Sequence, residues 1–299
     1  MTDKQWGHVA ALALGVCLHA TALAQITVRD DRSVSVTLAA PPQRIVSLLP
    51  SLTESVCVLG GCARLVGTDR FSNSPASVLA LPKLGGINDA LIEPIVALKP
   101  DVVLAAPSAR VIDRLEALGV KVVVLESRNH AEVRRTLNLL SQLLGVPAQA
   151  GAVWAGIERD LSEAAARVPA SLRGQRVYFE VDATPYAAGA GSFIGETLAR
   201  LGLANAVPIE LGPFPKLNPE FVVRAQPDIV MAAQQNLADM PQRAGWAALS
   251  ALKSRRSCGF DGPRYELLTR PGPRLGEAAQ VLADCLVGLS KVPKVPKVP

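Results

Sequence analysis

The sequence predicts an α/β fold in which two lobes are joined by a single long helix, and three observations carry this prediction. Residues 147–168 combine strong helix formers with apolar positions that recur at a helical period. Strands alternate with helices on both sides of this stretch, which is the order that gives mainly parallel sheets. Two segments that precede the long helix recur after it in the same order. The alternative is a surface helix within one domain.

In the N-terminal half, hydrophobic periodicity and turn residues define the expected elements. Apolar residues alternate with polar ones in a β-hairpin at 25–40. Ser51 and Glu54 match a capping box, so a helix is expected to start at Ser51 and to end at Gly60. The other elements expected here are a strand at 44–49, a strand at 65–68, a helix and a strand within 93–106, a helix at 111–118, a strand at 120–125 and a helix at 131–144.

The long helix divides the chain into its expected parts. Pro147 suits a first helical turn, and about 21 helical residues would span roughly 30 Å, the width of a small domain. The expected parts are an N-terminal α/β lobe at 25–146, an inter-lobe helix at 147–170 and a C-terminal α/β lobe at 171–290.

The C-terminal half repeats the pattern of the first. Residues 220–233, EFVVRAQPDIVMAA, match residues 93–106, EPIVALKPDVVLAA, at 7 of 14 positions. Glu54 and its following Leu-Gly recur as Glu196 followed by Leu201-Gly202. Two repeats in one order predict two related lobes. A strand is also expected at 176–181, and a final amphipathic helix at 275–289.

The two ends of the chain resemble a targeting signal and a tail. Residues 1–24 have a short n-region, an apolar h-region and an A-x-A site, which together predict a cleaved secretory signal peptide. Lipid attachment at Cys17 is disfavoured, because Val16 stands where a small residue is needed. Residues 291–299 are three copies of KVP, which predict a disordered or polyproline-like tail.

Composition excludes several classes of partner. The net charge is only +5, and its basic residues are scattered, so no nucleic acid is expected to bind. A metal site or a resident cofactor is not expected either, because a single histidine, His130, lies beyond the signal peptide. We expect His130 to cap a helix or to face solvent.

Four cysteines follow the signal peptide, and export would place them in an oxidising compartment. Pairing Cys57 with Cys62 and Cys258 with Cys285 keeps each disulfide within one lobe. The two other pairings remain open at this point.

Catalytic patterns are absent from the sequence. It contains no G-x-S-x-G elbow and no phosphate-binding Walker loop. A secreted α/β hydrolase or transferase stays as an alternative, and it would use Glu54, Glu180 or Asp182 as acid or base.

Loop aromatics and two acidic residues are the better candidates for function. Phe71, Tyr186 and Phe214 all fall in loops, where they could line one cleft between lobes. Glu93 and Glu220 open matched helices, so each lobe would present one carboxylate on a common face. Such a pair could meet arginines of a two-fold symmetric partner, although an acid there also suits the helix dipole.

With RIVSLLPSLTESVCVLG, IEPIVALKPDVVLAA and RPGPRLGEAAQVLADCL in view, the chain resembles a known family over residues 44–286. It is similar to periplasmic substrate-binding proteins of the cobalamin and iron-siderophore class, which serve ABC importers, and most of all to the vitamin B12-binding members. The resemblance implies a class III fold, with two Rossmann-like lobes and one backbone helix, that binds its ligand in the cleft. We expect a periplasmic monomer that delivers cobalamin, or else an iron siderophore or heme, to a permease dimer in the inner membrane.

The resemblance also implies roles for individual residues. Phe71, Tyr186 and Phe214 fall at ligand-contacting aromatic positions, and Glu266 falls at an acidic position near the ligand. Ile87 and Ala106 stand where the vitamin B12-binding members carry tryptophans. Glu93 and Glu220 match the glutamates that engage arginines of the permease. A sensor that reports its ligand to a membrane partner without transport is a further alternative.

Overall fold

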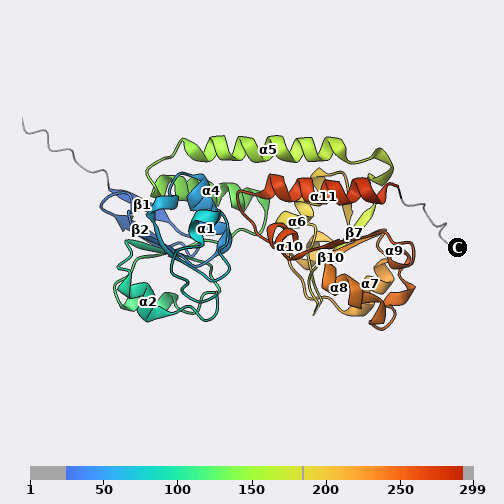
Figure 1. Cartoon of the computed structure of the whole chain (residues 1–299), viewed down its shortest axis with the longest axis horizontal. Coiled ribbons are helices and arrows are strands. Elements are labelled where there is room, and N and C mark those ends of the chain that lie inside the picture. Colours follow the sequence, from blue (N-terminus) through green and yellow to red (C-terminus); the bar gives the residue numbers. More distant parts are fainter. Residues whose placement is uncertain (1–24, 184, 292–299) are drawn as a thin grey trace, which may run out of the picture.

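The computed structural model describes residues 25–183 and 185–291, and it contains two lobes that lie side by side beneath one long helix (Figure 1). This helix, α5 (Gln149–Arg167), runs along both lobes on one side of the molecule. The predicted fold class is therefore confirmed. The predicted signal peptide (1–24) and the tail residues 292–299 lie outside the described residues.

The N-terminal lobe is built on a parallel sheet with the strand order β4-β3-β5-β6. A short antiparallel hairpin, β1–β2, precedes it. The strands are β1 (Ile26–Arg29), β2 (Ser35–Leu38), β3 (Ile45–Ser47), β4 (Leu65–Thr68), β5 (Val102–Ala105) and β6 (Val122–Val124). The helices are α1 (Pro50–Val58), α2 (Ile92–Ala97), α3 (Ile112–Ala117) and α4 (His130–Leu143).

The C-terminal lobe follows the same chain path, with the parallel order β9-β7-β10-β11. In both lobes the first strand therefore lies second in the sheet. One short strand, β8, adds antiparallel to β7. The strands are β7 (Arg176–Asp182), β8 (Tyr186–Ala187), β9 (Ala204–Asn205), β10 (Ile229–Ala233) and β11 (Ser257–Phe260). The helices are α6 (Phe193–Arg200), α7 (Pro219–Ala225), α8 (Gln234–Asp239), α9 (Ser250–Lys253), α10 (Gly262–Leu268) and α11 (Leu275–Leu289).

The internal repeat extends to single backbone angles and hydrogen bonds. Lys99 and Gln226, which are matched residues, both have positive φ angles, of 45° and 42°. The Asp101 carboxylate accepts a hydrogen bond from the Arg44 N–H at 2.9 Å. In the other lobe, the Asp228 carboxylate accepts one from the Arg176 N–H at 2.9 Å. The Pro-Asp motif therefore ties the entry of one strand to its neighbour in both lobes.

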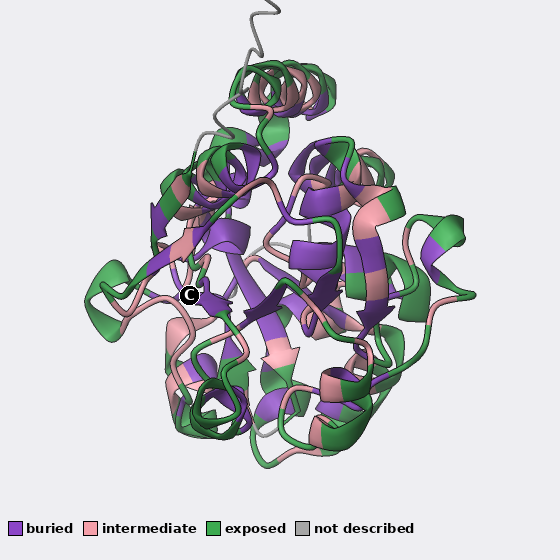
Figure 2. Cartoon of the chain, turned by 90° about the vertical axis from the view of Figure 1, so that its left-hand side faces the viewer, coloured by how far each residue is buried: buried purple, intermediate pink, exposed green. Residues whose placement is uncertain are grey.

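Both sheets are buried on their two faces, which explains their continuous apolar strands such as Val122–Val124. In α5, by contrast, burial is confined to one side: Ala150, Ile157, Leu161 and Ala164. This side packs on α4 in one lobe and on α11 in the other. The opposite side of α5 is largely exposed (Figure 2), so the helix bridges the lobes from outside.

The predicted capping box at Ser51 is wrong. Helix α1 begins at Pro50, and Leu49 is its N-cap residue without a side-chain hydrogen bond. Proline is well suited to the first helical position, since its ring has the required φ angle and it has no N–H to satisfy. The end of the helix is as predicted, because Gly60 has a φ of 86°.

The described residues form two disulfides, Cys57–Cys62 and Cys258–Cys285, and each lies within one lobe as the favoured pairing requires. No helix among the described residues is both long enough and apolar enough to cross a membrane.

Candidate functional site

A cavity of about 470 Å³ lies between the two lobes. It is lined by Leu49, Ser51, Leu52, Ile87, Ala106, Pro107, Ser108, Leu125, Glu126, Ser127, Arg128, Val181, Phe193, Ile194, Phe214, Thr269 and Pro271. Most of these residues follow the ends of strands β3, β5 and β6, and Val181 lies near the end of β7. The carboxyl ends of parallel strands are the usual binding edge of open α/β sheets. The cavity size is typical of small-molecule sites.

The repeat makes the two walls of the cavity partly symmetric. Ser51 and Leu52 contribute from the first turn of α1, and Phe193 and Ile194 contribute from the first turn of α6. The N-lobe wall is thus the more polar at this point. On the opposite side, the Phe193 ring packs on Phe214 with centroids 5.7 Å apart.

Three of the six predicted ligand residues line this cavity: Ile87, Ala106 and Phe214. Phe71 is 54% exposed, and its ring lies against Gly86, next to Ile87. Tyr186 is 41% exposed on β8. Both aromatic rings are therefore open to solvent, and neither is among the described residues that line the cavity.

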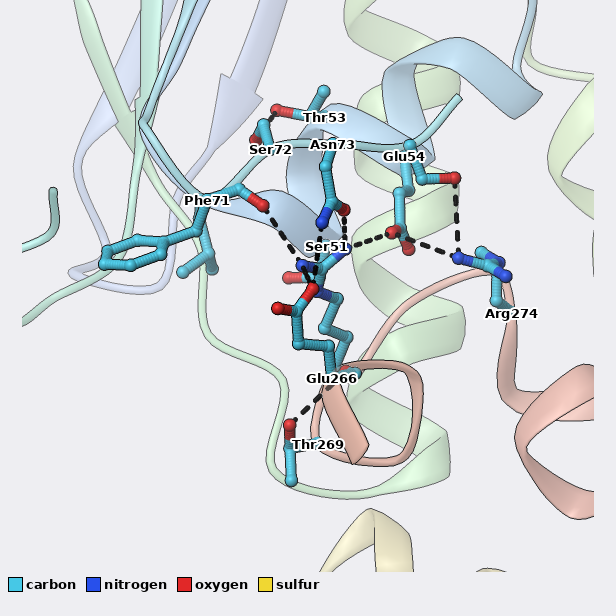
Figure 3. Close-up of polar contacts among 12 residues, drawn as sticks. Ser51, Thr53, Glu54, Phe71, Ser72, Asn73, Glu266, Thr269 and Arg274 are labelled. Carbon is cyan, nitrogen blue, oxygen red and sulfur yellow. Dashed lines mark hydrogen bonds and ion pairs between the residues drawn. The ribbon is translucent and has the colours of Figure 1, made fainter. Parts of the chain in front are cut away.

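Glu266, the sixth predicted ligand residue, belongs to a polar cluster that joins the lobes (Figure 3). It accepts hydrogen bonds from Asn73 at 2.9 Å and from Arg270 at 2.7 Å. Arg270 also donates to Glu54 of α1 at 3.0 Å, and Arg274 lies 3.7 Å from the same carboxylate. Burial raises the pKa of Glu54, while its hydrogen bond to Arg270 opposes this rise.

A second contact joins the lobes at α4 and α6, and it corrects the prediction for His130. This residue is buried, and its Nε2 lies 2.9 Å from the hydroxyl of Thr197. Its backbone N–H donates to Glu196 at 2.7 Å. Asn129 supplies the helix cap instead, and accepts from the Glu132 N–H. Because the side chain of Asn129 caps the helix, the side chain of His130 can pack between the lobes.

The charged groups on the cavity wall are already paired with one another. Arg128 lies 2.8 Å from Glu132 and 3.8 Å from Glu126. The hydrogen bond from Arg128 lowers the pKa of Glu132. Arg128 is the one basic residue among the described cavity-lining residues, so the wall carries little unbalanced positive charge.

The acid or base candidates of the hydrolase alternative do not converge on this cavity. Neither Glu54, Glu180 nor Asp182 is among the described residues that line it. Glu180 is fully buried and accepts two hydrogen bonds from Arg243, at 2.5 and 3.0 Å. Burial is also the main cause of the raised pKa of neighbouring Tyr178. This cluster packs the interior of the C-terminal lobe.

Two further expectations concern the surface and metal ions. Glu93 and Glu220 are exposed in the first turns of α2 and α7, which lie on the side of the lobes away from α5 (Figure 1). Across the described ranges, 25–183 and 185–291, no group of three or more His, Cys, Asp or Glu side chains is arranged to hold a metal ion.

Sequence reasoning missed several residues of the cavity, above all 107–108, 125–128 and 193–194. The rule that ligands bind at the carboxyl ends of parallel strands could have indicated the first two segments, because both follow predicted strands. Arg270 was also missed. It lies in the motif RPGPR, but three of its four partners are about 200 residues away in the chain.

Comparison with known proteins agrees with this architecture. The family model described as "Periplasmic binding protein" matches residues 45–260, more than half of the chain. This chain belongs to the periplasmic binding protein family. Proteins of this family bind substrates and are not enzymes.

Three relatives illustrate the range of this periplasmic binding protein family. An ABC transporter substrate-binding lipoprotein of Bacillus subtilis is 28% identical over 272 residues, covering 87% of this chain and 85% of that protein. A vitamin B12-binding protein of Vibrio vulnificus is 26% identical over 241 residues, covering 79% and 87%. The structure of a periplasmic heme-binding protein from Pseudomonas aeruginosa aligns with a TM-score of 0.70 and 25% identity, covering 85% and 95%. The family and fold predictions are confirmed.

Proposed function

We propose that this protein is the substrate-binding component of an ABC importer and that it receives cobalamin or a related corrinoid in the cavity between its lobes. The chemistry of the cavity wall is the observation that carries the proposal. Its described residues are mostly apolar, with serine and threonine hydroxyls, Glu126 and one arginine that is already paired. This wall suits a large chelate that brings its own metal ligands and carries little net charge.

Heme fits this wall less well, because heme iron is usually held by His, Tyr, Cys or Met. None of these residue types is among the described residues that line the cavity. The heme propionates would also need positive partners, and Arg128 is engaged by Glu132. Tyr186, a predicted ligand residue that is 41% exposed, is a candidate for an iron ligand, and it keeps heme as the alternative that a test must exclude.

Anionic siderophores meet the same difficulty. A ferric tricatecholate carries several negative charges, and the wall offers no cluster of unpaired basic side chains among its described residues. In cobalamin, by contrast, the corrin ring and its nucleotide base already occupy the cobalt, and amides surround the ring. Hydroxyls such as those of Ser51, Ser108 and Thr269 could meet these amides without a charge. The vitamin B12-binding relatives also favour this choice.

Calorimetry with four purified ligands tests the proposed ligand. The ligands are cyanocobalamin, hemin, a ferric trihydroxamate and a ferric tricatecholate. We expect one cyanocobalamin per chain and no heat from the other three. If hemin binds and its binding is lost in Tyr186→Phe, heme would replace cobalamin as the proposed ligand. No heat from any of the four would overturn the proposal of a metal chelate.

Delivery is proposed to use Glu93 and Glu220. Both are exposed, and they lie on one side of the molecule, one on each lobe. The charge reversals Glu93→Lys and Glu220→Lys together should abolish uptake in a transport assay and leave cyanocobalamin binding intact. Unchanged uptake would contradict this docking role. Loss of uptake with normal binding would also argue against a sensor that does not transport.

The proposed location is the periplasm, reached through the predicted signal peptide at 1–24. Fractionation of cells that express the full chain tests this. We expect a shorter, monomeric protein in the periplasmic fraction, beginning near Gln25.

A further inference from the structure

Each lobe reaches across the cleft with one glutamate, and the two occupy matching places in the repeat. Glu54 and Glu196 each precede a Leu-Gly helix end by five residues. Glu54, on α1, accepts from Arg270 of the C-terminal lobe at 3.0 Å. Glu196, on α6, accepts from the His130 N–H of the N-terminal lobe at 2.7 Å. With α5, these contacts connect the lobes at three places.

Arg270 makes the more extensive of the two contacts. Three of its four acceptors belong to the opposite lobe: the carboxylate of Glu54, the amide oxygen of Asn73 at 2.8 Å and the carbonyl of Phe71 at 3.0 Å. The fourth acceptor is Glu266, one turn earlier in its own lobe. The Arg270 side chain is only 10% exposed. Water therefore competes little with these bonds.

The same arginine holds the loop that carries Phe71. The backbone of Phe71 is fixed from both sides, because its N–H donates to the Asp69 carboxylate at 2.7 Å and its carbonyl accepts from Arg270. Its ring is left exposed and extends away from the cluster (Figure 3). An arginine of one lobe thus orients an aromatic residue of the other.

The neighbours of Arg270 are part of the cavity wall. Thr269 and Pro271 both line the cavity, and so does Ser51, one turn before Glu54 on α1. The backbone at Gly272 comes so close to Ser51 that an added Cβ would lie 3.2 Å from the serine Cβ. Movement at the Arg270 contact would therefore move the walls of the cavity.

We propose that Arg270 is a cross-lobe positioning residue, which sets the width of the cleft before any ligand arrives and holds the Phe71 loop at its edge. If the cleft is formed before the ligand binds, binding does not have to include the entropic cost of ordering two lobes and a loop. The expected effect of Arg270 on ligand affinity rests on the proposed function. Its expected effect on the distance between the lobes is independent of that function.

A distance measurement on the ligand-free protein tests the proposal. Spin labels are attached at Ala97→Cys on α2 and Arg224→Cys on α7, two exposed positions in different lobes. We expect a single narrow distance distribution by pulsed electron paramagnetic resonance. Arg270→Gln should broaden it and lengthen its mean. The matched control is Arg264→Gln, since Arg264 is 66% exposed and pairs only loosely with Asp261, at 3.9 Å.

A second variant keeps the test decisive if Arg270→Gln does not fold. Asn73 is exposed, and Asn73→Ala removes one acceptor of Arg270 without opening the interior. It should broaden the distribution less than Arg270→Gln. Distributions like that of the unmodified protein in a folded Arg270→Gln, or in Asn73→Ala if only that variant folds, would overturn the proposal.

Ligand kinetics then separate this inference from the proposed function. For folded Arg270→Gln we expect cyanocobalamin to dissociate about tenfold faster, with a smaller change in association. Arg270→Lys should restore only part of the slow dissociation, because a single ammonium cannot serve four acceptors arranged around a planar guanidinium. If the unmodified protein binds no cyanocobalamin, the proposed ligand fails, and the distance measurement still decides the role of Arg270.

Discussion

Glu54 and Glu196 occupy matching positions in the two lobes, yet their surroundings differ. The side chain of Glu54 is 3% exposed and meets the guanidinium of Arg270, whereas that of Glu196 is 39% exposed and meets a backbone N–H. One contact between the lobes is thus ionic and shielded from water, and the other is half solvated. The repeat determines the position of each glutamate, but the partner from the other lobe determines how much the contact contributes to stability.

The disulfides differ between the lobes in a similar way. Cys57–Cys62 spans a sequence separation of 5, and Cys258–Cys285 spans 27. The first holds the end of α1, whereas the second ties β11 to α11, the helix that packs on α5.

The largest expected effect comes from removing these disulfides. Loop-closure entropy predicts a loss of about 3.6 kcal/mol in the free energy of unfolding for a Cys258→Ser/Cys285→Ser variant, and about 2 kcal/mol for Cys57→Ser/Cys62→Ser. Urea denaturation of the two double variants measures the difference. A larger loss in the N-terminal lobe would mean that strain or residual structure in the unfolded chain outweighs loop length.

The next effect compares the two cross-lobe glutamates directly. Glu54→Ala leaves Arg270 buried without its main counterion, and breaking such a pair costs about 3 kcal/mol. Glu196→Ala removes a half-exposed acceptor and should cost about 1 kcal/mol or less. Urea midpoints of both variants report the difference. Equal losses would show that burial does not distinguish the two contacts.

The two lobes also contribute aromatic rings that differ in burial. Phe214 lines the cavity and packs on Phe193, while Phe71 is 54% exposed beside it. Phe214→Ala should weaken cyanocobalamin binding by about 2 kcal/mol, roughly thirtyfold, because a ring that is already partly desolvated is lost. Phe71→Ala should weaken it less. Calorimetric titration of both variants tests this order, and the reverse order would place the ligand nearer the cleft edge.

Much of this fold could be predicted, because local patterns carry it. The repeat of the Pro-Asp motif predicted two related lobes. The strand predicted at 65–68 and the helix predicted at 275–289 have the bounds that the structure shows. The cap of α1 was wrong for a physical reason. Glu54 has the spacing of a capping box, but a partner from the other lobe, Arg270, occupies its carboxylate.

The site was less predictable, since it is made where distant segments meet. Ile87, Ala106 and Phe214 line the cavity, and their contact with a ligand stays a prediction. The contacts of Arg270 span about 200 residues of sequence, and no periodicity or spacing indicates them. Burial of His130 has the same origin: the residue after a cap is ordinarily exposed, and only the approach of α6 buries it.

The smallest effect, and the one that separates the two contacts by sign, is their response to pH. Burial lowers the pKa of His130 below 6.5, although the charge of Glu196 opposes this and Arg200 and Glu158 also act on it. His130 therefore takes up its proton more readily in the unfolded chain than in the folded protein. Its contribution to the free energy of unfolding is fully present above pH 6.5 and falls on acidification.

For Glu54 the sign is opposite, because burial raises its pKa above 4.5. The folded protein takes up this proton more readily, so this contribution grows as the pH falls toward 4.5 and is lost as the pH rises through the raised pKa. Urea midpoints at about pH 7.5 and about pH 5.5 should fall less in His130→Gln than in the unmodified protein, and fall more in Glu54→Gln. If the urea midpoint changes equally with pH in both variants, other groups control the pH dependence of stability, and the two contacts do not differ in protonation.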